Sequence, residues 1–580
     1  MNDSYNSWSE VLLVVGAGAT AKLGMPQSDS QSKIFRALAS AGETFEENKW
    51  KDYTIRDILS NKGLEKVLDD EQVFSGQNLE VLVAFFELLG NNLKNNWNVV
   101  STEDIENARV VFGNHDRELL ESRIRELRLE YDWNALKQII QICPHDSDND
   151  NLIRDLFTIV DQKMAARQGI KVVNGFIAYN RMNGARNCAV LIIKILFASA
   201  WYKLSRENGS EDFKKYKAFA KTLASMMQKE GLKFQTKFPE LQSRNFYLFT
   251  YSILNFNFEK IFERLLVFAH REANHAGRYL RTSQKQKIWL DFGVEQRFRN
   301  TRGKSGFGLS VDETVCQRIN ENKNVGSDIY RVGKFFFVHG SANWRECPAC
   351  GCKFVYEAEN WDLFHRHHNP PLPIPLFEAD DFKRTKEEEK WKNELRLDSL
   401  ECPSCGAETT ASASPMIMQT MVKGIPTSFL EEIQRNAKVS LKKARHIILF
   451  GYSLPPDDIV WQEAFAEAVR HRMDEDERPF CSVVVGYRGE KKWLYDDELK
   501  FYLAKHKGCK DSSAYGIDAI ENAISIFGLN HVRAYCGGIP DVWGNASEAE
   551  IKEILYPEWV DWKGTRLESF NIQTAFAERL

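Results

Sequence analysis

The chain has 580 residues, of which 43% are hydrophobic and 27% charged, close to the average for soluble globular proteins. This composition excludes a collagen-like, low-complexity or wholly disordered protein, and the length predicts roughly four domain-sized units, or fewer if one domain carries long insertions. The 77 Lys and Arg residues nearly balance the 81 Asp and Glu residues, giving a formal net charge of −4. That balance argues against non-specific binding of nucleic acid as the main role.

The chain start and the apolar runs predict a cytoplasmic protein without a membrane segment. The first ten residues, MNDSYNSWSE, contain neither a basic nor an apolar leader region, so no signal peptide is predicted. The most apolar run, 189–201, is too short to span a bilayer and contains Lys194, so we interpret it as a buried core helix. Four of the 11 cysteines form two Cys-x-x-Cys pairs, which fits a reducing compartment better than a disulfide framework would.

Short apolar runs separated by helical stretches predict an α/β fold with a parallel sheet. Residues 11–15, VLLVV, predict a strand buried on both faces that ends in the turn GAGAT. Residues 78–89 predict a helix. Further strands are expected at 246–256, 335–338, 446–450 and 481–485.

The pattern of charged and apolar residues divides the chain into four parts. Charged, helical segments fill 91–240, and we interpret this stretch as a helical insertion into one Rossmann-like α/β domain. The domain is then made of 1–90 and 241–486, with a zinc-binding module at 345–410, and a C-terminal region, 487–580, follows without a recognisable motif.

The insertion is rich in paired charges, such as Arg123, Arg125, Glu126 and Arg128. We expect it to form an assembly or partner surface, and a solvated cap over the domain is the alternative. Since most soluble oligomers have closed symmetry, the expected assembly is a homo-oligomer.

The cysteine pairs are the most specific local signal. Both have two residues between the thiols and a glycine after them, and their members are Cys347, Cys350, Cys402 and Cys405. Four thiolates at this spacing predict a closed, tetrahedral and therefore structural zinc site. Two redox-active pairs or an unfilled remnant are the alternatives, and Cys352 or the histidines at 365–368 could supply a substitute ligand.

Two glycine-containing loops follow predicted strands. Gly16-Ala17-Gly18-Ala-Thr20 could bring backbone N–H groups to a phosphate, although Ala21 breaks the G-x-G-x-x-G spacing, and a simple strand–helix turn is the alternative. Gly451-Tyr-Ser453 offers close backbone approach and a hydroxyl that could meet a phosphate or ribose; a loop ended by two prolines is an equal interpretation.

A histidine, His339, follows the strand predicted at 335–338. Ligands bind at the carboxyl ends of strands in open α/β sheets, and an imidazole with an ordinary pKa of about 6.5 suits proton transfer near neutrality. A structural histidine is the alternative.

The order of these motifs resembles the sirtuins, and in detail their divergent bacterial branch, the sirtuin-like NAD+ hydrolases of antiphage defence. Gly-Ala-Gly is followed by Gly-Met-Pro26, then by Asn257-Phe-Glu259, HGSANW, the two cysteine pairs and GYSLPPDD. The piece from Asn257 to Glu263 falls in register with the branch pattern Asn-Tyr-Asp-x-Leu-Leu-Glu. The resemblance covers about 10–90 and 245–485.

The resemblance implies a Rossmann domain that holds NAD+ between the glycine turn and the zinc module. His339 and Asn257 would flank the nicotinamide ribose as catalytic residues. The implied cofactor-binding residues are Gly16, Ala17, Gly18, Thr20, Pro26, Glu259, Gly451 and Ser453, with the last two on the adenosine side.

Departures from the family pattern bear on the activity. Glu259 stands where the family has Asp, and Gln27-Ser-Asp29 replaces the Asp-Phe-Arg of the deacylases. The stretch 415–421, PMIMQTM, replaces the Phe-Gly-Glu strand that pairs with their substrate peptide.

The resemblance thus implies hydrolysis of NAD+ to nicotinamide and ADP-ribose by an effector of antiphage defence that depletes NAD+ in abortive infection. The alternatives are an NAD-dependent protein deacylase and a non-catalytic module that senses NAD or ADP-ribose. The implied partners are further copies of the chain, a translocase-type ATPase or an Argonaute-type protein, or a phage trigger, and neither a membrane nor direct nucleic-acid contact is expected.

Overall fold

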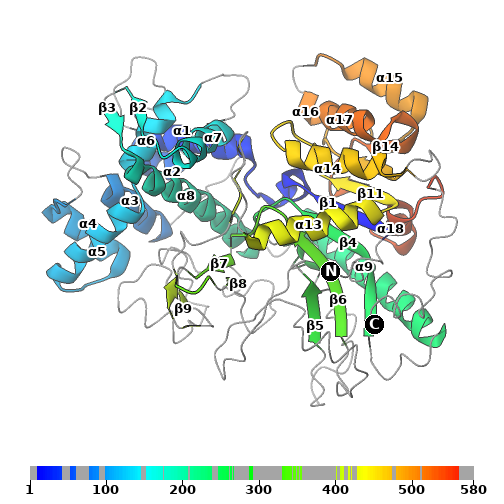
Figure 1. The fold of residues 1–580 in the computed structure, drawn as a ribbon, viewed down its shortest axis with the longest axis horizontal. Helices are drawn as coiled ribbons and strands as arrows, with labels where there is room; N and C mark the ends of the chain where they lie inside the picture. Colours follow the sequence, from blue (N-terminus) through cyan, green and yellow to red (C-terminus); the bar gives the residue numbers. More distant parts are fainter. Residues whose placement is uncertain are drawn as a thin grey trace.

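A computed structural model of the chain shows two lobes (Figure 1). The residues it describes are 10–41, 52–60, 77–90, 98–144, 152–173, 175–206, 210–237, 246–259, 287–291, 330–342, 428–472, 478–509 and 512–560, with shorter, interrupted pieces within 261–269, 344–355, 400–409 and 416–420. The predictions that concern Cys402, Cys352, the histidines at 365–368 and Pro415 lie outside the described residues.

A sheet of eight strands is the centre of the first lobe, here called the sheet lobe. In spatial order the strands are β13 (Trp493–Leu494), β14 (Val532–Tyr535), β12 (Phe480–Val484), β11 (His446–Phe450), β1 (Val11–Val15), β4 (Phe246–Asn255), β6 (Tyr330–Phe337) and β5 (Lys287–Asp291). Neighbouring strands are parallel throughout, except that β13 runs antiparallel to β14. The predicted α/β class and every predicted strand are confirmed.

Strand β1 occupies the middle of the sheet because all five of its side chains are apolar and buried. Its last residue, Val15, is in register with Phe450 of β11 and Asn255 of β4, and Asn255 is in turn in register with Phe337 of β6. Four strands therefore end along one line. The loops that follow them form what we call the carboxyl edge.

Helices cover the sheet lobe: α9 (Glu211–Lys237), α13 (Ser428–Lys443), α14 (Ile459–Arg470), α15 (Asp496–His506), α16 (Ser512–Tyr515), α17 (Ile517–Phe527) and α18 (Glu548–Leu555). In its core, Phe219 of α9 stacks on Trp543 with ring centroids 4.3 Å apart. Both residues belong to the hydrophobic cluster that contains β1. Helix α9 thus belongs to the sheet and not to the helical insertion in which the sequence analysis placed it.

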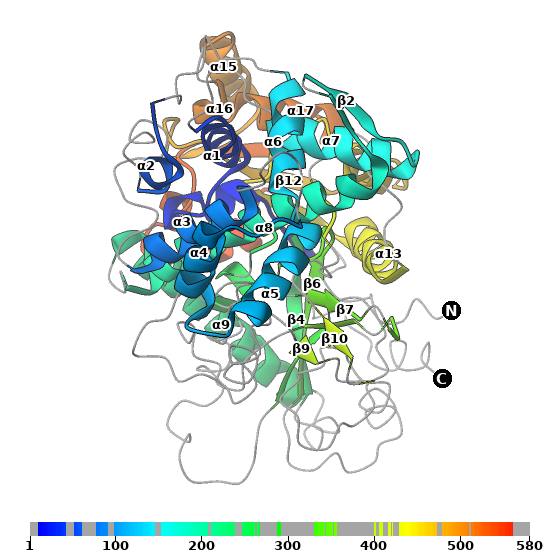
Figure 2. The same cartoon turned by 90° about the vertical axis from the view of Figure 1, so that its left-hand side faces the viewer.

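A second hydrophobic cluster forms the helical lobe. Its helices are α1 (Ser28–Ser40), α2 (Ile55–Leu59), α3 (Gln77–Gly90), α4 (Thr102–Phe112), α5 (Arg117–Glu130), α6 (Trp133–Ile142), α7 (Leu152–Ala165) and α8 (Tyr179–Arg206), joined by a hairpin of β2 (Ile170–Val172) and β3 (Gly175–Ile177). Figure 2 views this lobe from the side, with α5 packed against α4 and α8. The lobe begins at α1, well before the boundary expected at residue 91.

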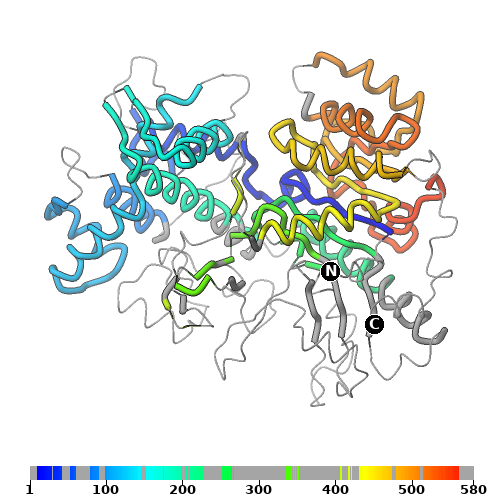
Figure 3. The backbone as a smooth tube through the Cα atoms, in the orientation of Figure 1, coloured from blue at the N-terminus to red at the C-terminus, as the bar shows by residue number. Residues whose placement is uncertain are grey.

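Figure 3 follows the chain from β1 into the helical lobe and back to the sheet through α9. Within α8, residues 189–196 are buried, which confirms the predicted core helix. Among the described helices, none is both long and apolar enough to cross a bilayer. Beyond residue 486, β13, β14 and α15–α18 continue the same sheet lobe, so the domain extends past the expected boundary.

The prediction of a charged surface on the insertion is wrong for Arg128. Its side chain is buried on α5, where the guanidinium donates to the Leu88 and Val99 carbonyl oxygens and lies 2.6 Å from Asp104 Oδ1. Arg128 therefore fixes three helical segments to one another. Arg123 and Arg125 do pair with acidic residues of their own helix at the surface.

Candidate functional site

The glycine turn directly follows β1 and packs against the loop after β11. The Gly16 N–H donates to Phe450 O at 2.9 Å, and the Gly18 N–H donates to Gly451 O at 3.0 Å. A Cβ built on Gly16 would lie 2.6 Å from Gly451 O, and one on Gly18 would lie 3.0 Å from Gly451 Cα. The contact between two loops thus requires these glycines, whereas the sequence pattern predicts them for the approach of a phosphate.

Most N–H groups of the turn serve the fold. Those of Gly16, Gly18, Ala19 and Thr20 donate to protein carbonyl oxygens. Ala17 is exposed and Gly18 half-buried, so these two positions are the parts of the turn that face outward. Pro26 lies further along the chain, before α1, and its carbonyl oxygen accepts from Gln31 Nε2 at 2.9 Å.

Glu259 connects the turn to the loop after β4. Its Oε1 accepts from Thr20 Oγ1 at 2.9 Å and from Asn257 Nδ2 at 3.0 Å, and its Oε2 accepts from the Ile261 N–H at 2.7 Å. Burial raises the pKa of the Glu259 carboxyl, and the hydrogen bonds from Ile261, Thr20 and Asn257 oppose that rise. Both carboxyl oxygens therefore bind protein donors, and Glu259 anchors two predicted site residues.

Asn257 is buried beside the turn. Besides Glu259, its Nδ2 donates to Gly16 O at 3.0 Å, while its backbone N–H donates to Asn255 Oδ1 at 3.0 Å. The side chain is held on both sides, which fixes the amide at the point where β1 and β4 end.

His339 lies in a tight turn shortly after the end of β6. Gly340 has a φ of +80°, and its N–H donates to Phe337 O at 3.0 Å, which closes the turn around the histidine. Only 7% of His339 is exposed, and its ring packs edge-on against Phe256 at 5.2 Å. Its Nε2 lies 3.4 Å from Asp458 Oδ1.

The loop after β11 contributes Gly451 to the site, but the Ser453 side chain is exposed. Gly451 has a φ of +58°, and a Cβ there would lie 2.2 Å from Ala19 N, so only glycine fits. Between these residues, Tyr452 is buried and stacks on Phe256 with centroids 4.1 Å apart. Neither Tyr452 nor Asp458 is predicted from the sequence, where the two aspartates after Pro-Pro are the available signal for Asp458.

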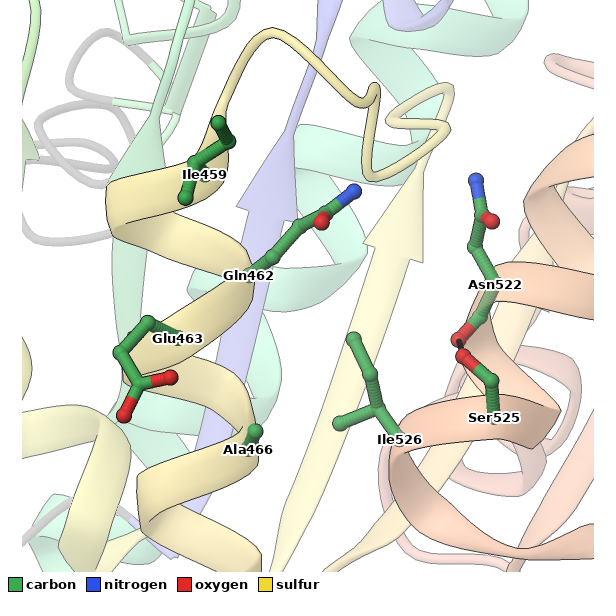
Figure 4. A pocket seen from close by; sticks show the side chains of 7 residues that line it. All are labelled: Ile459, Gln462, Glu463, Ala466, Asn522, Ser525 and Ile526. Carbon is green, nitrogen blue, oxygen red and sulfur yellow. Dashed lines mark hydrogen bonds between the residues drawn. The ribbon is translucent and has the colours of Figure 1, made fainter.

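A shallow pocket of about 280 Å³ lies behind this loop, between α14 and α17 (Figure 4). Its lining residues are Ile459, Gln462, Glu463, Ala466, Asn522, Ser525 and Ile526. The amide of Gln462 donates to Leu454 O at 2.8 Å, and that of Asn522 donates to Ser453 O at 3.1 Å. The two amides of the pocket thus hold the Gly451 loop from outside.

Three predicted metal ligands come together. The sulfur atoms of Cys347, Cys350 and Cys405 lie within 4.8 Å of one another, and the Cys347–Cys405 separation is 3.6 Å. Tetrahedral zinc with Zn–S bonds of about 2.3 Å would set sulfur separations of about 3.8 Å. The cluster could therefore bind a metal ion.

Short hairpins present these cysteines. The first pair lies between β7 (Trp344–Glu346) and β8 (Lys353–Val355), and the second between β9 (Leu400–Glu401) and β10 (Glu408–Thr409). Gly351 has a φ of +67°, and its N–H donates to Cys347 O at 2.9 Å, which turns the chain around the first pair.

The carboxyl edge thus brings together segments that are hundreds of residues apart: the glycine turn, Asn257 with Glu259, His339 and Gly451. Ser341 Oγ and the Ala342 N–H both donate to Phe258 O at 3.1 Å, which joins the loop after β6 to the loop after β4. Neither a scan against protein-family models nor a search of curated proteins finds a match to this chain.

Proposed function

We propose that the chain is an NAD+ hydrolase, which cleaves NAD+ to nicotinamide and ADP-ribose. The observation that carries this proposal is the convergence at the carboxyl edge. An amide bonded to the glycine turn, Asn257, and a shielded imidazole, His339, follow the adjacent strands β4 and β6. Ligands bind at this position in open α/β sheets.

The proposed reaction needs few groups. Water attacks C1′ of the nicotinamide ribose, and the C–N bond breaks with its electron pair passing to nicotinamide, which leaves as a neutral base. No acid is required for this leaving group. One group must orient the water and one must accept its proton, and we assign these roles to Asn257 and His339.

The remaining motifs would position the substrate. Outward-facing Ala17 and Gly18 would approach the pyrophosphate, and Gly451 with Ser453 would approach the adenosine side. Glu259 and Thr20, which bond to each other, would hold the turn and Asn257 in place. In this proposal they act through the loops and do not touch the substrate.

The metal in this proposal is a structural zinc. Cys347, Cys350 and Cys405 fit tetrahedral thiolate coordination, and Cys402 would be the fourth ligand. A closed thiolate site leaves no open position for substrate, so the zinc would join the two hairpins and take no part in cleavage.

The stretch that replaces the deacylase platform supports hydrolysis over deacylation. Met416 forms an isolated antiparallel bridge with Gly340, and the Ile417 N–H donates to His339 O at 2.8 Å. Met416 and Met418 are buried in the cluster of the helical lobe. The backbone of Met416 and Ile417 therefore already pairs with the backbone of His339 and Gly340. An acyl-lysine peptide would need free backbone groups at this place to pair with.

We further propose that NAD+ depletion serves antiphage defence, and that the chain acts as a homo-oligomer together with a partner protein or a phage trigger. Both proposals rest on the resemblance of the motifs to the bacterial branch.

The direct test measures nicotinamide release from NAD+ by the purified protein, with and without an acetylated peptide. We expect release without peptide, and a loss of about 10²–10⁴-fold in His339→Ala and in Asn257→Ala, as is usual when general-base help is removed. Thermal unfolding of each variant controls for misfolding. Cleavage only with peptide would establish the deacylase instead, and NAD+ binding without cleavage would establish a sensor.

A further inference from the structure

We propose that Asp458 is a positioning residue, which orients His339 and stabilises its protonated form. This inference rests on the proposed function, because His339 is the proton acceptor of that reaction. Asp458, the carboxylate that this inference adds to the site, lies about 120 residues after His339 in the chain.

The geometry joins three buried side chains in a row. Asp458 Oδ1 lies 3.4 Å from His339 Nε2, and Asp458 Oδ2 accepts from the Tyr452 hydroxyl at 2.8 Å. The His339 and Asp458 side chains are 8% and 4% exposed. Because little water reaches the pair, the carboxylate acts on the imidazole more strongly than it would at the surface.

Asp458 is the N-cap residue of α14, but its side chain makes no capping hydrogen bond. An N-cap aspartate ordinarily accepts from a backbone N–H of the first helical turn. Here the carboxylate instead reaches Tyr452 and His339. Its backbone is fixed independently, since the N–H donates to Pro455 O and the carbonyl oxygen accepts from Trp461 and Gln462, each at 2.9 Å.

Tyr452 fixes one oxygen of the carboxylate. Burial, and then the charge of Asp458, raise the pKa of the Tyr452 hydroxyl, so it stays a proton donor throughout the physiological range. Its ring is stacked on Phe256, whose ring also packs edge-on against His339. The same aromatic frame therefore holds both partners of Asp458.

This arrangement determines which imidazole nitrogen carries the proton. A carboxylate facing Nε2 favours the tautomer with hydrogen on Nε2, which leaves the lone pair on Nδ1 to accept a proton from water. Once His339 is protonated, the negative charge of Asp458 stabilises the imidazolium. The uncharged rings of Phe256 and Phe258, from the end of β4, also pack against the His339 ring.

The principal test is Asp458→Asn, which keeps the shape and an oxygen that can accept from Tyr452. We expect kcat for NAD+ cleavage to fall roughly 10–10³-fold, less than in a complete triad, with KM within about threefold. Asp457→Asn is the matched control and should leave kcat unchanged.

Tyr452→Phe is the second variant. It keeps the stacked ring and removes only the hydroxyl that holds Oδ2, so we expect a smaller loss of kcat, about 2–10-fold, with an unchanged melting temperature. Should Asp458→Asn fail to fold, this variant still tests the contacts between Tyr452, Asp458 and His339, and a wild-type kcat in it would overturn the proposal.

A spectroscopic readout separates this inference from the hydrolase itself. NMR spectra of the protein labelled with ¹³C at the histidine ring are recorded without NAD+, and His339→Gln identifies the His339 signal. The ring shifts report the tautomer, and the Nε2–H form of His339 should be less populated in Asp458→Asn than in wild type. Identical His339 shifts in the two proteins would overturn the proposal, whereas a changed tautomer in a protein that cleaves no NAD+ would leave the contact standing and overturn the hydrolase.

Discussion

The two lobes place their buried polar groups differently. In the helical lobe, the buried ion pair of Arg128 with Asp104 lies between α3, α4 and α5. In the sheet lobe, Thr20, Asn257, Glu259 and His339 all gather where the strands end. The Arg128 pair thus joins three helices that are neighbours in the sequence, whereas the polar groups at the carboxyl edge join loops from distant parts of the chain.

The comparison shows how one set of residues can serve both fold and site. Gly16, Gly18 and Gly451 allow two loops to pack backbone to backbone, and Glu259 then ties the first of them to Asn257. A residue can therefore match a ligand-binding motif and yet be required for an internal contact. Variants of the sheet lobe need a stability measurement beside every activity measurement.

The largest effect is expected at the metal cluster, which contacts the sheet lobe where Trp344 packs on Phe337 at the end of β6. Cys347→Ser should release the metal and destabilise the sheet lobe by several kcal/mol, given the scale of about 10–16 kcal/mol for structural zinc sites. Elemental analysis of the wild type should find about one zinc per chain. Hydrogen exchange should increase around β6 and His339 but not in α4 and α5, and a metal-free protein with native protection would refute the site.

The next effect falls on the helical lobe. Arg128→Ala leaves the Asp104 carboxylate buried without its partner, which typically costs about 3–5 kcal/mol. Exchange in α3, α4 and α5 should increase while the carboxyl edge keeps its protection. The matched control is Arg125→Ala, whose surface pair with Glu121 should contribute below about 1 kcal/mol. Equal effects of the two variants would show that Arg128 is not an internal anchor.

Sequence reasoning succeeded where one signal determines one structure. Five consecutive apolar residues at 11–15 predict a central strand because both faces of a parallel sheet are covered. The spacing of Cys347 and Cys350 predicts a turn that presents two thiols. The order of strands followed by Gly, Asn and His also placed most candidate residues at a common edge, as the register of β11, β1, β4 and β6 requires.

The failures come from residues whose partners are distant. In α5, Arg128 follows Leu120, Ile124 and Leu127 on the apolar face, so the helical spacing contained the signal of burial, but its partner Asp104 could not be read from it. Strand β14, VRAY, is short and contains Arg533, which is fully buried against the Trp493 ring at 3.8 Å. The direction of the Asp458 carboxylate depends on Tyr452 and His339, which no local pattern reveals.

A smaller effect should distinguish two glycines of the sheet lobe that both have positive φ. Gly451→Ala brings a Cβ to 2.2 Å from Ala19 N and should cost about 2–4 kcal/mol, since backbone strain of about 1–3 kcal/mol adds to the clash. Gly24→Ala, at φ +78° with open space around it, should cost only about 1–2 kcal/mol. Denaturant unfolding measures both, and equal losses would show that the two loops do not pack as described.

The smallest predicted effect is on the stability of the sheet lobe as the pH changes. His446 of β11 is fully buried, where its ring nitrogens lie 2.9 Å from Leu555 O and 2.7 Å from Ser482 Oγ. Burial, and then the nearby positive charge of Arg533, lower the pKa of His446 to about 3. The unfolded chain, with an ordinary histidine pKa of about 6.5, therefore binds one more proton between these values.

The sign of the effect follows from that proton. The contribution of neutral His446 to stability is complete above about pH 6.5, and the free energy of unfolding should fall as the pH drops towards 3, by up to about 1.4 kcal/mol per pH unit. Because carboxyl groups also titrate in this range, the informative quantity is the difference between wild type and His446→Gln, measured by denaturant unfolding at each pH. The variant starts less stable at pH 7, since it disturbs the bond to Ser482, but its stability should fall less steeply below pH 6.5. Parallel curves would mean that His446 titrates as it does in the unfolded chain, because water reaches the interior of the sheet lobe. The buried polar groups of the interior would then resemble those at the carboxyl edge in their exposure to water.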